Sequence, residues 1–304
     1  MKIWILKATV QKIISCLPFS HRINFLFQKY ITRGVDLTDE YFEDRLEHLR
    51  QHLHYFEEYS SGEKKSAVEL GTGWYPIIPV AMSLYGFEKI FSLDIHSFVS
   101  KERLITTLEK FSDYYQRKRL PEFLKKASLT ELETLIKHSG KFSPEEILKE
   151  LRITLLIQDA RQLPFENNSV DLITSNNTFE HVYPSVLMGI LKEFKRVVKS
   201  GGVMSHFIDM SDHFAHLDKS ITIYNFLKFS DKQWKRIDNS IQPQNRWRMN
   251  DYEQLYDSLQ IPVTEKNCRA GDVESLQRVT VNKKFKNYSA PDLAISHCYV
   301  ISKF

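Results

Sequence analysis

Cysteine, glycine, proline and long apolar runs are all scarce in this sequence of 304 residues. Its three cysteines, Cys16, Cys268 and Cys298, are odd in number, lie far apart and form no CxxC pair. They therefore predict no disulfide framework and favour a reducing compartment. Only ten glycines and ten prolines are present, which excludes collagen-like and low-complexity chains.

No apolar run approaches the roughly 18 residues of a membrane-spanning helix, and the apolar patch at residues 3–6 is shorter than a signal-peptide core. We therefore expect a cytoplasmic protein with no transmembrane segment. The 42 Lys and Arg residues barely exceed the 38 Asp and Glu residues, which argues against a nucleic-acid partner. Apolar residues make up 42% of the chain, enough for the core of one large domain.

Acidic residues are absent from residues 1–35, which carry six Lys and Arg residues. Apolar side chains recur there near helical spacing, so the sequence predicts an amphipathic helix packed on the domain. Weak contact of its basic face with an acidic membrane surface is the alternative. We assign residues 1–60 to a helical N-terminal extension and residues 61–304 to the main domain.

From residue 66 onward, short apolar runs alternate with helical patterns, which predicts a parallel sheet with helices on both faces. Two final strands are expected after residue 260. The predicted helix from Ser185 to Lys199 should stop at Ser200-Gly201-Gly202. The predicted strands are residues 67–70, 90–93, 153–157, 170–174 and 203–208.

Two segments exceed what this alternation needs. Residues 97–151 form an insert long enough for two to four helices. Residues 211–260 are rich in aromatic side chains with Lys and Arg between them, which should keep one face of the segment wet. We expect both segments to cover the ligand crevice and to supply contacts to a second substrate; packing behind the sheet is the alternative.

Ligands of an open parallel sheet bind beyond the carboxyl ends of its strands, so the residues at these ends are candidates for binding. The first strand ends in a Gly-x-Gly turn that opens a helix, where glycine allows a tight turn and close approach of a ligand. The candidate residues that follow the first four strands are Glu69, Gly71, Thr72 and Gly73, then Asp94, then Asp159 and Ala160, then Asn176.

In order and spacing these residues resemble those of class I S-adenosylmethionine-dependent methyltransferases. The resemblance implies a Rossmann-like, doubly wound α/β fold with a mostly parallel seven-stranded sheet, and S-adenosylmethionine as the cofactor. It places Glu69 to Gly73 at the methionine part, Asp94 at the ribose, Asp159 and Ala160 at the adenine, and Asn176 near the sulfonium. Tyr75 departs from the pattern, since many members have a third glycine there.

A nicotinamide dehydrogenase is the rival interpretation of the Gly-x-Gly turn. A dinucleotide needs small residues and free backbone N–H donors at its diphosphate. Trp74 and Tyr75 are bulky and Pro76 lacks an N–H, which disfavours this interpretation.

The acceptor is expected to be a small molecule, with a hydroxyl of a saccharide as one candidate. Deprotonation of a hydroxyl calls for a base, and we predict His181 or His213 in this role, oriented by Asp209 or Asp212. Helix capping and loop hydrogen bonds are the alternative roles of these residues. Asp209, Asp212, His213 and His216 also have metal-ligand spacing, but no further carboxylate cluster accompanies them, so no metal is predicted.

Two other functions stay open: a catalytically silent module that binds S-adenosylmethionine, and a nucleic-acid methyltransferase. Retention of the acidic residues Glu69, Asp94 and Asp159 favours activity over the silent module. The fourth strand is not followed by an Asn/Asp-Pro-Pro-Tyr/Phe stretch, which weakens the resemblance to enzymes that methylate bases.

Overall fold

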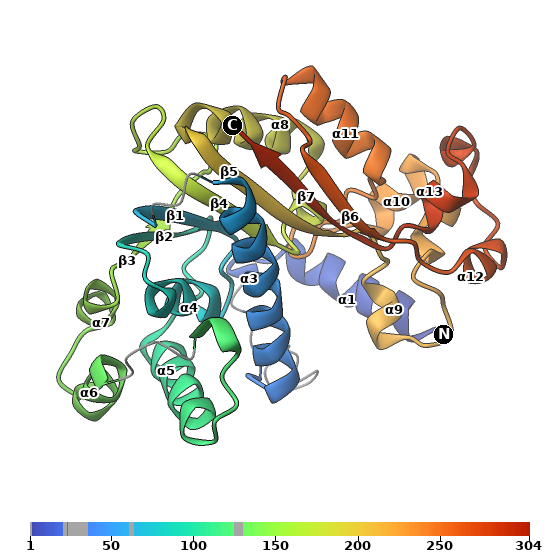
Figure 1. The fold of residues 1–304 in the computed structure, drawn as a ribbon. Helices are drawn as coiled ribbons and strands as arrows, with labels where there is room; N and C mark the ends of the chain where they lie inside the picture. The colour runs from blue at the N-terminus through green and yellow to red at the C-terminus, as the bar shows by residue number, and fades with distance from the viewer. Residues whose placement is uncertain (1, 21–22, 24–35, 61–63, 125–129) are drawn as a thin grey trace. The chain divides into compact units, whose positions relative to one another are not determined.

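A mixed seven-stranded sheet with flanking helices organises the chain in the computed structural model, which describes residues 2–20, 23, 36–60, 64–124 and 130–304. The strand order is β3-β2-β1-β4-β5-β7-β6 (Figure 1). This sheet confirms the predicted fold class. The strands are β1 (Ser66–Leu70), β2 (Lys89–Asp94), β3 (Ile153–Ile157), β4 (Val170–Asn176), β5 (Val198–Asp209), β6 (Glu265–Arg269) and β7 (His297–Lys303).

Parallel pairing joins the first four strands. β1 pairs with β2 and β4, with Glu69 opposite Ser92 and Thr174, and β2 pairs with β3. β7 runs antiparallel to β5, since Gly201 donates its N–H to Phe304 and Met210 donates to Ser296. The carboxyl ends of β1, β2, β3 and β4 therefore meet at one edge, where the predicted cofactor residues lie.

Helices connect and flank these strands. Among the described residues, the predicted insert contains α5, α6, α7 and the short helix η2, in agreement with the expected two to four helices. The helices are α1 (Ile3–Ser15), α3 (Asp39–Tyr59), α4 (Ile77–Tyr85), α5 (Lys101–Gln116), η2 (Glu122–Leu124), α6 (Thr130–His138), α7 (Pro144–Glu150), η3 (Phe179–His181), α8 (Pro184–Val197), α9 (Phe214–Leu217), η4 (Asn225–Lys228), α10 (Asp231–Ile237), α11 (Met249–Ser258), α12 (Val273–Gln277), η5 (Lys283–Phe285) and α13 (Ala290–Ala294).

The predicted helix stop at Ser200-Gly201-Gly202 is wrong in its detail. Helix α8 already ends at Val197, and the two glycines belong to β5. The reason is pairing with the end of the chain: the N–H of Gly201 donates to Phe304 and the carbonyl of Gly202 accepts from Phe304. These partners extend the strand into residues whose local preference is for a turn.

The described chain divides into two compact units, each made of separate segments. The first comprises Met1–Asp36, Asn177–Met188 and Phe207–Val300; the second comprises Leu37–Asn176, Gly189–His206 and Ile301–Phe304. Helix α3 belongs to the second unit together with β1 to β4. The division at residue 60 into an extension and a main domain stays a prediction.

The core of the second unit is built around β1, whose five residues are all buried. Helix α3 packs on α4 and β4. It begins at Thr38, whose side chain accepts the N–H of Tyr41, and it buries one apolar face at helical spacing. The residues of that face are Phe42, Leu46, Leu49, Leu53 and Phe56.

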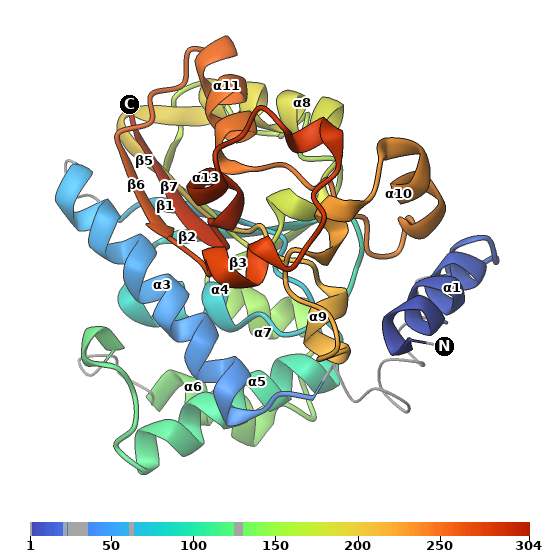
Figure 2. The ribbon, with the colours of Figure 1, turned by 90° about the vertical axis from the view of Figure 1, so that its right-hand side faces the viewer.

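Within the first unit, α1 packs against α9 and α10 (Figure 2). The indole ring of Trp4 contacts the rings of Phe214 and Phe229, and Nζ of Lys12 donates to the carbonyl of Asp238 at 2.6 Å. The predicted helix is therefore present, and Lys12 is engaged by the protein. The rest of the predicted basic segment, residues 21–22 and 24–35, lies outside the described residues.

No helix in the described part of the chain combines the length and the apolar character that a membrane crossing demands.

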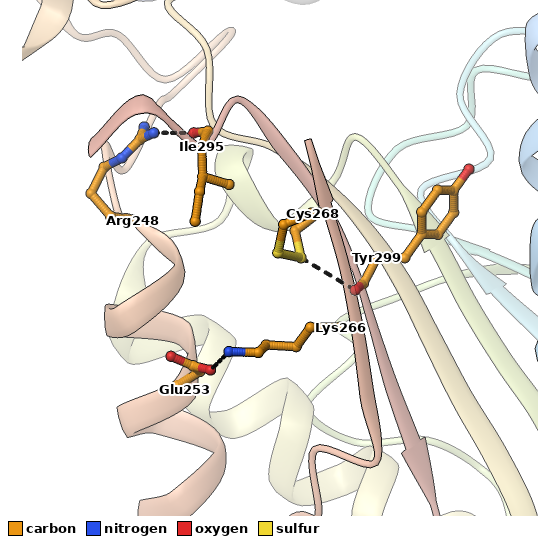
Figure 3. The surroundings of a disulfide bond; sticks show 7 residues. Arg248, Glu253, Lys266, Cys268, Ile295 and Tyr299 are labelled. Atoms are coloured by element: carbon orange, nitrogen blue, oxygen red, sulfur yellow. Dashed lines mark hydrogen bonds and ion pairs between the residues drawn. A yellow bond between two sulfur atoms is a disulfide. The ribbon is translucent and has the colours of Figure 1, made fainter. Parts of the chain in front are cut away.

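The prediction that the cysteines form no disulfide is wrong. Cys268 in β6 and Cys298 in β7 are joined by a disulfide, with Cα atoms 4.0 Å apart (Figure 3). The two residues are 30 positions apart in sequence, but neighbouring strands place them side by side. The cysteine-based argument for a reducing compartment therefore no longer holds, and only Cys16 remains a free cysteine among the described residues.

Candidate functional site

The turn between β1 and α4 contains two glycines in the left-handed region. Gly71 has a φ of 83° and Gly73 a φ of 72°, a backbone conformation that residues other than glycine rarely adopt. The N–H of Gly71 donates to the carbonyl of Leu93 at 2.8 Å, which fixes the turn against β2. A Cβ built on Gly73 meets no atom within 4 Å. The turn thus leaves open space beside its backbone, as close approach of a ligand requires.

Glu69 lies in β1, two residues before Gly71, and is 4% exposed. Oγ1 of Thr72 donates to its carboxylate at 2.8 Å and lies 2.7 Å from Oγ of Ser92. Burial raises the pKa of Glu69 to about 7, against the opposing effect of the Thr72 hydrogen bond. Thr72 therefore orients the carboxyl group of Glu69.

The raised pKa of Glu69 predicts that the free energy of unfolding falls as the pH increases from about 4.5 to about 7. The folded protein holds the proton of Glu69 more tightly than the unfolded chain, so this stabilisation is complete below the unfolded pKa and lost above the folded pKa. The difference is roughly 3 kcal/mol. Denaturant unfolding across this pH range should show a slope that Glu69→Gln removes; identical profiles of the two proteins would contradict the prediction.

Asp94 ends β2 and faces the Gly-x-Gly turn. Its carboxylate accepts the N–H of Gly73 at 3.3 Å and the N–H of His96 at 3.2 Å. Burial raises the pKa of Asp94, while these backbone hydrogen bonds oppose the rise. Two of the carboxyl groups predicted to bind the cofactor, those of Glu69 and Asp94, thus flank one turn.

The other predicted cofactor residues have partners within the second unit. Asp159 pairs with its neighbour Arg161, whose Nε lies 3.0 and 2.9 Å from the two carboxylate oxygens. The hydrogen bond from Arg161 lowers the pKa of Asp159, and Ala160 beside it is buried. Asn176 is buried at the end of β4, where its Oδ1 lies 2.9 Å from Nε2 of His52.

Sequence reasoning missed His52 as part of this arrangement. Its Nδ1 lies 2.7 Å from Oγ of Ser205, so His52 ties α3 to the end of β4 and to the interior of β5. Burial lowers the pKa of His52 to about 4, which keeps the ring neutral near pH 7. The sequence did contain a signal for this residue, because His52 falls on the apolar face of the helix that becomes α3.

Aromatic side chains also gather beyond β1 and β2. The rings of Trp74 and Phe98 lie 4.5 Å apart, and the guanidinium of Arg103 lies 4.7 Å from the Trp74 ring. Arg103 belongs to α5, so the start of the predicted insert packs on the residue that follows the glycine turn.

A cluster of histidines surrounds Asp209 in the first unit. Nε2 of His213 lies 3.1 Å and Nε2 of His216 lies 3.9 Å from Oδ2 of Asp209. The other oxygen, Oδ1, lies 3.4 Å from Nε2 of His297. The ring of His181 lies 4.8 Å from the ring of His213. The structure thus brings the three predicted catalytic residues together and adds His297, which the sequence analysis did not select.

The protonation of this cluster follows from burial and charge. Burial acts to raise the pKa of Asp209, but the hydrogen bonds of His213 and His216 outweigh it and hold the pKa well below its usual range. Burial, together with the neighbouring His213, lowers the pKa of His181 to about 4. Asp209 is therefore a carboxylate and His181 a neutral imidazole near pH 7.

The hydrogen bonds of Asp212 go to residues other than the histidines. Its carboxylate accepts from the side-chain amide of Asn225 at 3.0 Å and from the N–H of Phe214 at 2.9 Å. These bonds match the alternative role, loop and helix-end hydrogen bonding. Of the two acids considered as orienting groups, Asp209 is the one beside His213.

The expectation that Lys and Arg keep one face of residues 211–260 wet is wrong for two arginines. Arg246 is buried and bonds to the carbonyls of Phe226 and Phe229. Arg248 is fully buried and donates to the carbonyls of Met210, Leu293 and Ile295, the last contact being drawn in Figure 3. Backbone carbonyls at loop ends need donors, and the guanidinium groups supply them.

Comparisons with known proteins found one family match and several similar solved structures. Residues 125–205 match a family described as a methyltransferase domain. The chain is similar to a Pyrococcus horikoshii protein at 14% identity, over 91% of this chain and 97% of the other, with a TM-score of 0.49. It is also similar to geranyl diphosphate C-methyltransferase from Streptomyces coelicolor at 11% identity, over 86% and 78% of the chains, with a TM-score of 0.47. No curated protein matches the chain.

Residues 125–205 thus match a methyltransferase domain. The sheet, and the glycine turn with the carboxyl groups of Glu69 and Asp94 beside it, agree with an S-adenosylmethionine-dependent enzyme of this kind.

Proposed function

We propose that the protein transfers the methyl group of S-adenosylmethionine to a hydroxyl of a small-molecule acceptor, with a saccharide as the candidate class. The observation that carries the cofactor half of the proposal is the turn at Gly73. Its backbone has open space where a Cβ would stand, and the buried carboxyl group of Glu69 and the part-buried one of Asp94 lie beside the turn. When bound, S-adenosylmethionine supplies an activated methyl group for in-line displacement.

Each cofactor residue receives a role from its position. Glu69 and the glycine turn, including Gly71 and Thr72, hold the methionine part, and Asp94 accepts hydrogen bonds from the ribose hydroxyls. Asp159, Ala160 and Asn176 keep the roles that the family resemblance implies, at the adenine and near the sulfonium. These residues align the cofactor, which is the main task of a protein in a displacement reaction.

The acceptor side is assigned to the histidine cluster. His181 is the base in this proposal, since its imidazole is neutral near pH 7 and its Nδ1 lies 2.6 Å from the carbonyl of Pro243. If that bond uses the Nδ1 proton, Nε2 is left to accept one from a hydroxyl. His213 and Asp209 form a hydrogen-bonded pair beside His181.

Asp94→Ala should weaken binding of S-adenosylhomocysteine roughly 10- to 150-fold. The substitution removes hydrogen bonds from the ribose to a charged acceptor, which are worth about 1.5 to 3 kcal/mol. Calorimetric titration of the folded variant measures the change. Asp113→Ala, an exposed carboxylate of α5 paired with Arg117, is the control and should bind as the wild type does. Equal affinity of Asp94→Ala and wild type would remove Asp94 from the site.

A panel of acceptors tests the proposal as a whole. Transfer of a labelled methyl group to saccharides or other hydroxyl compounds is the expected result. Cofactor binding without transfer to any acceptor, including nucleic acids, would favour the silent binding module. Transfer to nucleic acid alone would favour the other alternative.

A further inference from the structure

The three side chains that meet at the end of β5 have the composition of an open metal site. Asp209 ends the strand, His213 precedes α9 and His216 lies within α9. One oxygen of Asp209 and one ring nitrogen of each histidine all lie within 4.8 Å of one another. Two histidines and one carboxylate are the ligands of many divalent-metal sites that keep free positions for a substrate.

We propose that Asp209, His213 and His216 bind one divalent transition-metal ion, of which zinc is the reference case. Zinc bound at its usual distances of about 2.0 to 2.2 Å holds neighbouring ligand atoms about 3.3 Å apart. The corresponding separations from Oδ2 of Asp209 are 3.1 Å to His213 and 3.9 Å to His216. Small side-chain movements are enough to close the site around an ion.

The surroundings of the three residues support this assignment independently of their spacing. Oδ1 of Asp209 accepts the N–H of Ser211 at 2.8 Å and lies 3.4 Å from Nε2 of His297, so Oδ2 is the oxygen turned to the two ligand histidines. Nδ1 of His213 lies 3.5 Å from the side-chain amide of Gln242, which leaves Nε2 for the ion. Outer contacts of this kind fix the orientation of metal ligands in proteins.

Access to the site is also provided. The side chain of His216 is 62% exposed, whereas those of Asp209 and His213 are 9% and 13% exposed. An ion with three protein ligands retains positions for water or for a substrate oxygen. If the proposed function is right, a bound ion can lower the pKa of the acceptor hydroxyl and so promote its deprotonation.

Metal binding is tested without cofactor or acceptor, so its outcome does not depend on the proposed function. The full chain, dialysed against a chelator, is titrated with Zn²⁺ by calorimetry and with Co²⁺ by visible absorption. We expect one ion per chain. His216→Ala should weaken binding by at least the roughly 10- to 100-fold that loss of an outer contact costs. The control is His54→Ala, which removes a similarly exposed histidine of α3 and should leave the affinity for Zn²⁺ unchanged.

Failure to bind one ion, or equal affinity of His216→Ala and His54→Ala, would overturn the metal site. Asp209→Asn provides a second variant that keeps the side-chain shape, and it should lose the Co²⁺ spectrum. The catalytic consequence is tested separately by methyl transfer with and without the chelator. An unchanged rate after removal of a demonstrated ion would overturn the role in acceptor activation and leave both metal binding and methyl transfer standing.

Discussion

Gly73→Val should abolish measurable binding of S-adenosylhomocysteine while the protein stays folded. The Cβ of the new residue would enter the open space beside the glycine turn, which we propose the cofactor fills and where no protein atom lies within 4 Å. The substituted side chain therefore meets the ligand and not the protein. Calorimetry measures the loss, and circular dichroism checks the fold.

A matched control separates this effect from backbone strain. Gly86, which follows α4, also has a positive φ and also has open space at its Cβ. Gly86→Val introduces the same unfavourable left-handed conformation, so the two variants should lose comparable stability. Only Gly73→Val should lose the cofactor. Equal affinities in the two variants would show that the turn at Gly73 is structural and does not contact the cofactor.

His181→Gln should lower kcat roughly 100- to 10,000-fold with the acceptor found in the panel, the range that a positioned general base contributes. Affinity for S-adenosylhomocysteine should be unchanged, since the cofactor residues lie in other segments. Initial rates at saturating cofactor measure the effect. His138→Gln, a histidine of α6, is the control and should keep the wild-type rate.

The pH dependence of kcat gives this prediction a second readout. Burial lowers the pKa of His181 to about 4, so the base stays neutral as the pH falls from 7 to 5. An ordinary histidine base would be protonated in that range, with loss of activity below about pH 6.5. A rate that declines with an apparent pKa near 6.5, or an unimpaired His181→Gln variant, would contradict the assignment.

The strands, and with them the strand ends at which the proposed cofactor residues lie, could be predicted from sequence because their signals are local. A short buried strand followed by Gly-x-Gly or by an acidic residue has few other interpretations, and the parallel pairing of β1, β2 and β3 places these ends together. The structure accordingly places Asp94 against Gly73, as this reasoning requires.

The errors arose where distant segments decide the outcome. Cys268 and Cys298 pair only because β6 and β7 are neighbours, a fact that their 30-residue separation does not reveal. Gly201 lies in a strand because Phe304, at the far end of the sequence, supplies its hydrogen-bond acceptor. Arg248 looks like a surface residue in sequence, but three loop carbonyls hold it in the interior.

Helix α1 has a consequence for how the protein is made. Its partners are synthesised much later, since the backbone N–H of Trp4 donates to Asp218, 214 positions further along the chain. Until residues 214–238 have been synthesised, the buried face of α1, with Trp4, Ala8 and Ile14, has none of its native partners from α9 and α10. Contacts between such distant residues form slowly, and apolar surface exposed in the meantime invites aggregation or chaperone binding. The nascent chain should therefore be prone to chaperone binding until these residues have been synthesised.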